Sequence, residues 1–255
     1  MTPPAASPPD GLRPDGPRPD GPSIVRPPRQ RWRLYIAVPA ASSPDDGPAG
    51  VRGWAGILAA SGLPLAADAS GRGRVVPAAP LPLGIAGERE VVDAYLAERL
   101  PVAVVRAAVA AVVPAGWTLV DLHDVWTGAP AAPAAVAAAE YRVVAAGAAR
   151  WEVEGAVLTL LAAGALPRER RREKKTTRYD LRPMLLALDV RSSDAAGVTL
   201  GMRLRHGPEA VGRPEEVVAA LGEPPAPALA EPLVVRSIVR ERLVLSDDPD
   251  APTLA

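Results

Sequence analysis

The chain has 255 residues, contains no cysteine, and carries 29 basic (Lys and Arg) and 29 acidic (Asp and Glu) side chains. The lack of cysteine excludes a cysteine-ligated iron–sulfur cluster, a cysteine-based zinc site, a catalytic thiol and disulfides, and the zero net charge argues against a protein that coats nucleic acid by bulk charge. We expect a soluble, cytoplasmic protein, because no apolar run reaches the about 18 residues that a membrane helix needs and the amino terminus lacks a secretion signal.

Residues 1–30 are predicted to be a disordered tail. The pentapeptide Arg-Pro-Asp-Gly-Pro occurs twice there, starting at Arg13 and Arg18. Repeated proline removes backbone donors, and the two pentapeptides contain no apolar side chain besides proline to bury. A docking peptide is the alternative interpretation.

Residues 31–127 are predicted to form a first α+β half. Trp32, Leu34, Ile36 and Val38 alternate with polar or less apolar residues, which is typical of a half-buried strand. The elements that follow are a helix at 51–61, one irregular strand within 63–84, a strand at 91–96, a helix from Pro101 to Pro114 and a strand at 117–126. The order β-α-β-β-α-β is that of the split βαβ, or ferredoxin-like, unit.

A second half is predicted at 139–246, after an Ala/Pro linker at 128–138 and before a disordered tail at 247–255. Its predicted elements are strands at 141–145, 177–181, 185–190, 198–206 and 233–245, and helices at 156–166 and 214–221. The sequence therefore predicts an α+β protein made of two tandem ferredoxin-like (split βαβ) halves packed together. One continuous mixed sheet is the alternative.

Catalytic motifs are absent from the sequence. No phosphate-binding loop, dinucleotide fingerprint or nucleophile elbow occurs. The two histidines, His123 and His206, are far apart, which excludes a histidine-rich metal site. In Asp121-Leu122-His123-Asp124 a carboxylate could orient the His123 ring for general-base work, although a histidine near a strand end that is hydrogen-bonded to a loop is the simpler interpretation. We expect a non-catalytic protein without a cofactor or metal.

A basic run from Arg168 to Arg178 is the strongest local feature. It contains seven basic and two acidic residues, a net charge of +5 in a neutral chain. Such a density of cations favours contact with phosphates, because each neutralised phosphate releases counterions. A solvated loop after a helix is the alternative.

Two later strands are predicted to present arginines on one face. In 198–206 the apolar residues alternate with Arg203 and Arg205, and in 233–245 we expect Arg236, Arg240 and Arg242 to lie opposite the buried side chains. Five arginines would then share the uncovered face of the sheet, the face that single-strand RNA modules of this topology use. That face lacks obvious aromatic residues, and pairing with acids across a domain interface is the alternative. The predicted anion- or RNA-binding residues are Lys174, Lys175, Arg178, Asp180, Arg182, Arg203, Arg205, Arg213 and Arg240, with Asp180 orienting Arg182.

The second half resembles the radical-SAM-linked domain of unknown function, a bacterial domain fused to or encoded beside a radical SAM protein. The resemblance rests on Leu161–Pro167, the basic run and Asp180–Pro183, and it extends from Arg31 to Leu245. Further matching segments are Leu204–Pro208, Arg213–Val217, Leu221–Gly222, Gly62–Leu65, Pro80–Gly84, Pro114–Gly116 and Ala139–Tyr141. The chain departs from the family at Pro48–Trp54, which lacks a Ser-His-Leu-Asp type motif, and at Ser70–Arg74, which replaces an aromatic loop.

The resemblance implies a radical SAM protein as partner and a genetic neighbourhood of RNA-processing and ribosomal proteins, but no reaction. We therefore expect a non-catalytic RNA-binding or substrate-presenting accessory to a radical SAM enzyme. Two alternatives stay open: an enzyme or binding protein for a small phosphorylated or carboxylated ligand, and a protein–protein adaptor.

Overall fold

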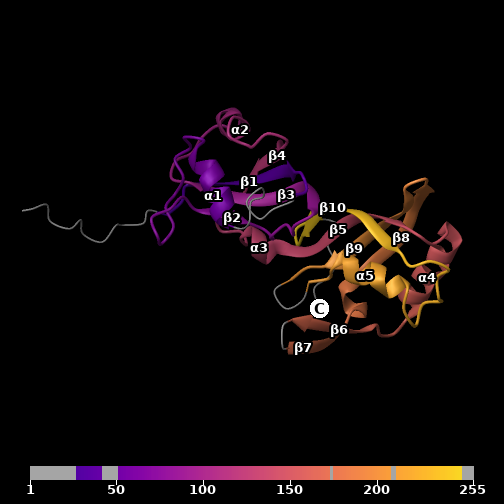
Figure 1. Cartoon of the computed structure of the whole chain (residues 1–255). Helices are drawn as coiled ribbons and strands as arrows, with labels where there is room; N and C mark the ends of the chain where they lie inside the picture. The colour runs from indigo at the N-terminus through magenta and orange to yellow at the C-terminus, as the bar shows by residue number, and fades with distance from the viewer. Residues whose placement is uncertain (1–26, 42–50, 173–174, 208–210, 249–255) are drawn as a thin grey trace, which may run out of the picture.

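The computed structural model describes residues 27–41, 51–172, 175–207 and 211–248 (Figure 1). The fold is mixed α+β, as predicted, with one large mixed sheet and few helices. The strands are β1 (Gln30–Val38), β2 (Val75–Pro77), β3 (Ile85–Leu96), β4 (Thr118–Asp124), β5 (Val136–Ala146), β6 (Pro167–Arg172), β7 (Lys175–Asp180), β8 (Leu185–Asp194), β9 (Gly197–Arg205) and β10 (Val234–Leu245). The helices are α1 (Val51–Ala59), α2 (Val102–Ala110), α3 (Ala132–Ala135), α4 (Arg150–Ala162) and α5 (Pro214–Leu221), with a 3-10 turn at Arg182–Met184.

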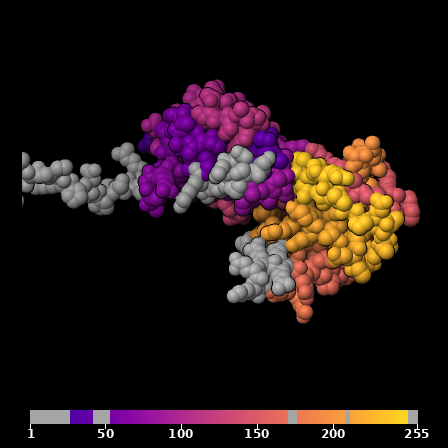
Figure 2. All heavy atoms as spheres, viewed as in Figure 1, coloured from indigo at the N-terminus to yellow at the C-terminus, as the bar shows by residue number. Residues whose placement is uncertain are grey.

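One eight-stranded sheet runs through both halves in the order β4-β1-β3-β10-β5-β9-β8, with β2 beside β3. The halves join where β3 and β10 pair in parallel, Ile85–Gly87 against Ile238–Arg240. Numbered by chain order within each half, the strands of the sheet lie side by side as fourth, first, third and second. The order is β4-β1-β3-β2 in the first half and β10-β5-β9-β8 in the second. The halves thus share a continuous sheet, and Figure 2 shows them as two masses that meet along the middle of the molecule.

Two hydrophobic cores lie under the helices. In the first half, Trp54 of α1 meets Trp117 edge to face at 5.2 Å, above Leu34 and Ile36 of β1. In the second half, α4 and α5 cover Tyr141 and its neighbours on β5. Ile36 in the first core pairs with Glu90, and Tyr141 in the second core pairs with Arg240. Because Glu90 and Arg240 bond each other, these four side chains lie on one face of the sheet, and the helices cover that face. We call the opposite face the open face.

Part of the open face of the first half is covered by the segment that links the halves. Arg33 of β1 donates to Asp93 of β3 at 2.9 Å, and both side chains are buried. Asp93 also accepts from the backbone N–H of Ala132, at the start of α3. The buried Arg31 donates to the carbonyl oxygen of Ala129 at 2.9 Å. Buried charges therefore hold the linker against the sheet.

Several predicted boundaries differ from the structure. α4 starts at Arg150 rather than at 156, because the Glu152 carboxylate accepts from the N–H of Ala149 and so caps the earlier turn. The predicted linker contains α3 and the start of β5, and part of the predicted basic loop is strand β6. Within the described ranges, no helix is both long and apolar enough to cross a membrane. The predicted tails lie outside the described residues, except for 27–30 and 247–248.

Candidate anion-binding surfaces

The open face of β9 carries two arginines as predicted, but one of them is neutralised. Arg203 donates to Glu140 of β5 through Nε at 2.9 Å, and Arg242 of β10 donates to the same carboxylate at 2.7 Å. Burial raises the pKa of Glu140, yet the hydrogen bonds from Arg242 and Arg203 outweigh burial and hold it below its ordinary value. One ionised carboxylate therefore occupies both guanidinium groups.

The rest of this face is also balanced in charge. Arg142 pairs with Glu88 and with Glu241, and Arg191 donates twice to Glu241, at 2.7 and 2.9 Å. Further acids are Asp189, 3.7 Å from Arg191, and Asp248, 3.9 Å from Arg242. Each of these four arginines is paired with an acid, but among the described residues only the pair of Arg142 with Glu88 joins the two halves, whereas the alternative noted above expected pairing across a domain interface. A continuous cationic platform is not formed there.

Arg240 does not lie on the open face, so that prediction is wrong. Its side chain is 1 % exposed and points to the helix-covered face. The register of β10 against β5 shifts between Val235 and Ser237 and again between Arg240 and Arg242. A bulge adds one residue to one strand and thereby reverses which residues face the core. Arg236 sits in the first shift and is exposed.

Arg240 instead forms a buried ion pair at the junction of the halves. It bonds Glu90 of β3 through Nε at 2.8 Å and through Nη2, and it donates to the carbonyl oxygen of Pro80 at 3.1 Å. Burial raises the pKa of the adjacent Tyr141 despite the nearby Arg240. Burial, and secondarily Arg240, lowers the pKa of His206 to about 4. A charge whose donors are used in this way stabilises the junction rather than binding a ligand.

Asp180 and Arg182 build the root of a hairpin formed by β6 and β7. Asp180 Oδ1 accepts from the N–H of Leu166 at 2.7 Å and of Arg182 at 2.9 Å. The Arg182 guanidinium donates to the carbonyl oxygens of Leu161 and Ala163 at the end of α4, where a cation is favourable. Both residues are thus positioning residues, and Asp180 orients the Arg182 backbone rather than its guanidinium.

The hairpin, which we call the basic hairpin, is a two-stranded sheet separate from the main one. Its strands read PRERRR and KTTRYD, with six basic and two acidic residues. Arg178 is largely exposed and bonds Glu169 on the facing strand at 2.6 Å. Lys175 lies in β7, whereas Lys174 lies outside the described residues. In Figure 1 the hairpin forms the lower margin of the second half.

Two predicted cations lie near the hairpin root or beyond it. Arg205 donates to the carbonyl oxygen of Pro183 at 3.3 Å, and Arg213 is exposed immediately before α5. Neither comes together with Arg203 and Arg240 in one site. The structure therefore divides the predicted set among the hairpin, the open face and the buried junction.

A cavity of about 570 Å³ separates the basic hairpin from α5. Arg168 lies in its wall and bonds Glu223, which follows the end of α5. Glu169 and Glu216 also line the cavity. Because three carboxylates and one guanidinium group line this cavity, it disfavours a phosphate or carboxylate ligand.

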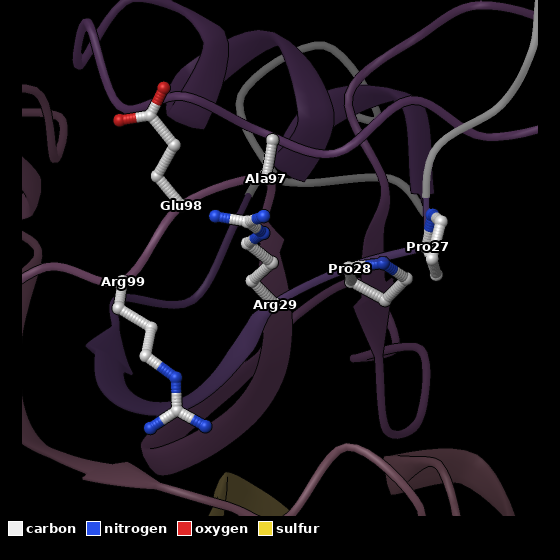
Figure 3. Close-up of a pocket in the computed structure, with 6 residues that line it drawn as sticks. All are labelled: Pro27, Pro28, Arg29, Ala97, Glu98 and Arg99. Atoms are coloured by element: carbon white, nitrogen blue, oxygen red, sulfur yellow. The ribbon is translucent and has the colours of Figure 1, made fainter.

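A second groove, of about 850 Å³, lies beside the start of β1 and the end of β3. It is lined by Pro27, Pro28, Arg29, Ala97, Glu98 and Arg99 (Figure 3). In Figure 3 the charged ends of Arg29, Glu98 and Arg99 point in different directions. Side chains that diverge are not arranged to hold one small ligand together, so this groove is not proposed as the anion-binding site.

Of the two carboxylates that flank His123 in the sequence, Asp121 contacts the ring, with Oδ2 and Nε2 3.1 Å apart. Sequence reasoning missed three residues that join this pair: Tyr35, Arg89 and Arg106. They come from β1, β3 and α2, so no local motif could have indicated them. Among the residues that the structure describes, no group of three His, Cys, Asp or Glu side chains could hold a metal ion.

A model of a protein family described as "Uncharacterized protein conserved in bacteria (DUF2344)" matches residues 71–214, more than half of the chain. Among solved structures, one titled "Crystal Structure of a Cbf5-Nop10-Gar1 Complex" is 11% identical, with a TM-score of 0.46. The match covers 83% of this chain and 48% of that chain, so this chain spans about half the length of the other. No curated protein matches the sequence. The solved structure is too dissimilar to support an argument about function.

Proposed function

Residues 71–214 place the chain in DUF2344, a family of uncharacterised proteins conserved in bacteria, and we propose that it is a non-catalytic RNA-binding protein that contacts phosphates through the basic hairpin. The observation that carries the proposal is the charge of the hairpin strands. Their net charge is +4, although the whole chain has a net charge of zero. Local excess of cations is what attracts a polyanion, since the phosphates release counterions on binding.

The shape of the hairpin also supports the proposal. A two-stranded ribbon can lie along a nucleic-acid backbone or enter a groove. Here the ribbon pairs with no strand of the main sheet, and its root is held by the buried Leu166 and Leu181. A firmly held root lowers the entropy that binding would otherwise cost.

RNA is proposed rather than DNA because the family resemblance implies a neighbourhood of RNA-processing genes. The same resemblance leads us to propose that the bound RNA is presented to a radical SAM partner. A chain without cysteine cannot supply the ligands of the cluster that radical SAM chemistry requires, so that partner would hold it. Pull-down of the tagged chain with and without RNase tests the partner: recovery of RNA without an iron–sulfur protein would reject it.

The hairpin proposal is tested by a salt titration of RNA affinity. Fluorescence anisotropy with a labelled single-stranded RNA, at several salt concentrations between about 50 and 200 mM, gives the slope of log K against log salt. Replacing Arg170, Arg171 and Arg172 by Gln is expected to lower the affinity about tenfold or more and to reduce the slope by about 2, since each single-strand phosphate contact contributes about 0.7.

The matched control removes three exposed arginines from the first half. Arg29, Arg72 and Arg99 are exposed, and replacing them by Gln changes the net charge by the same amount. We expect this variant to bind RNA nearly as the wild type does. Equal losses in the two variants, or a wild-type slope near zero, would reject the hairpin as the binding element.

We also infer that the halves are tandem ferredoxin-like units joined edge to edge. The support is the strand order, which is fourth, first, third, second in both halves, with antiparallel neighbours in each. This is the order of a split βαβ unit. A crystal structure with another order in either half would overturn this inference.

A further inference from the structure

Five side chains gather where β4 forms the outer edge of the sheet in the first half. Asp121 and His123 belong to β4, Tyr35 to β1, Arg89 to β3 and Arg106 to α2. We call them the Asp121 cluster. The basic hairpin belongs to the second half, so the two features can be tested separately.

Charge is unbalanced in this cluster, unlike on the open face of the second half. Asp121 lies 3.6 Å from Arg89, 3.6 Å from Arg106 and 3.1 Å from His123. Burial raises the pKa of Asp121, but the N–H of Leu122 and the three neighbouring side chains together lower it by more. The pKa therefore lies below its ordinary value, and the carboxylate is ionised. Two guanidinium groups and one imidazole thus lie around a single carboxylate.

The two guanidinium groups keep their donors available. Neither Arg89 nor Arg106 donates a hydrogen bond to any described residue, because 3.6 Å is an ion-pair distance without a directed bond. Arg142 and Arg242 show the opposite arrangement, since both donate directly to carboxylates. Guanidinium groups with unused donors suit phosphate oxygens, which accept two parallel N–H bonds.

An aromatic surface lies beside these donors. The Tyr35 ring has the Arg89 guanidinium over it at 4.4 Å and the His123 ring at its edge at 5.4 Å. About half of the His123 side chain is exposed. Rings and guanidinium planes of this kind stack on nucleobases without regard to sequence.

Two further acids, Asp247 and Asp248, act on Tyr35. Asp248 is already engaged, since it accepts from the N–H of Leu245 and lies 3.9 Å from Arg242. Burial, more than these acids, raises the pKa of Tyr35, so the phenol is neutral and can donate a hydrogen bond.

We propose that the Asp121 cluster binds a nucleotide phosphate monoester, with Arg89 and Arg106 on the phosphate and Tyr35 and His123 against the base. The ligand is either a free mononucleotide or the phosphorylated end of an RNA chain. The proposal goes beyond binding at the basic hairpin and does not depend on it.

The chain has two histidines, which makes imidazole NMR signals a direct test. Titration with 5′-adenosine monophosphate is expected to shift the His123 signals and to leave those of the mostly buried His206 in place. Inorganic phosphate should shift them at higher concentration, and adenosine without phosphate should shift them least. No movement of His123 with the mononucleotide, or an equal movement with adenosine, would overturn the proposal.

Variants identify the phosphate-binding groups. Arg89→Gln and Arg106→Gln are each expected to weaken the mononucleotide affinity about tenfold, the usual worth of a charged hydrogen bond. Arg142→Gln is the matched control and should leave the affinity unchanged. Unchanged affinity in both the Arg89 and Arg106 variants, each with a wild-type unfolding curve, would overturn the assignment.

Two oligoribonucleotides separate the sources of the phosphate. A 5′-phosphorylated strand that shifts His123 much more than the 5′-hydroxyl strand identifies an RNA end as ligand, and equal weak shifts identify the free mononucleotide. The hairpin variant with Arg170, Arg171 and Arg172 replaced should keep the mononucleotide response. Loss of that response would show that the cluster is not an independent site.

Discussion

The basic hairpin and the sheet of the second half are both rich in arginine, yet they differ in the balance of basic and acidic residues. On the sheet, Arg203 and Arg242 share Glu140, and Arg240 is buried against Glu90. On the hairpin strands, six basic residues face two acids. Arg203, Arg240 and Arg242 of the sheet hold the fold together through acids. The hairpin strands keep a net charge of +4, although Arg168 pairs with Glu223 and Arg178 with Glu169.

This difference shows that a count of arginines along strands does not identify a binding face. What matters is the number of carboxylates within reach, which depends on pairing between strands far apart in sequence. Glu140 lies 63 residues from Arg203 and 102 residues from Arg242 along the chain.

Removing the buried partner on the sheet is expected to destabilise the protein most. Glu90→Ala leaves the Arg240 guanidinium buried without its carboxylate, and such a loss costs about 3–5 kcal/mol of unfolding free energy. Urea unfolding followed by circular dichroism measures the change. Glu154→Ala, which breaks an exposed helical pair with Arg150, is the control and should cost about 0.5 kcal/mol. Similar losses in both variants would contradict a structural role for the buried pair.

Acid should weaken the same junction through His206. Its pKa is about 4 in the fold and about 6.5 in the unfolded chain. The unfolded state therefore binds a proton first as the pH falls, so the contribution of His206 to stability is complete above about pH 6.5 and declines towards pH 4.

The decline attributable to His206 is up to about 3 kcal/mol. Unfolding free energies measured across this pH range should fall more steeply for the wild type than for His206→Gln. Parallel curves for the two proteins would show that His206 does not titrate as described. The difference between the curves cancels the carboxylates, which titrate in both.

Removing the acid that two arginines of the open face share should produce the smallest effect, a gain in RNA affinity. Glu140→Gln removes the carboxylate that Arg203 and Arg242 share. RNA affinity at low salt is then expected to rise severalfold, on the order of one added phosphate contact. Arg203→Gln in the wild type should change the affinity by less than about twofold. A large loss in Arg203→Gln would place RNA on the open face instead.

Parts of the fold could be predicted from the alternation of apolar residues, because the strands there pair without a register shift. The alternation in β9 correctly placed Leu200, Met202 and Leu204 in the core, since no register shift interrupts its pairing with β5. The same logic failed in β10, where register shifts at 236 and 241 turn Arg240 inwards. A bulge has no reliable signature in one sequence, so strict alternation misplaces the residues beyond it.

The candidate sites were less predictable than the fold. The basic run was visible as charge, but β6 was not predicted, because arginines in succession show no apolar alternation. Tyr35, Arg89 and Arg106 come together only through the tertiary structure. His123 was noted because carboxylates flank it in the sequence, and of these Asp121, two residues away on the same strand, contacts it.

Mapping of RNA crosslinks shows directly whether the basic hairpin contacts RNA. Ultraviolet crosslinking of the full chain to RNA, followed by mass spectrometry of the peptides, reports which segment touches the nucleic acid. We predict crosslinks concentrated in peptides from 167–180, with few from β5, β9 and β10. Crosslinks concentrated on those sheet strands, with the hairpin unmodified, would contradict the account.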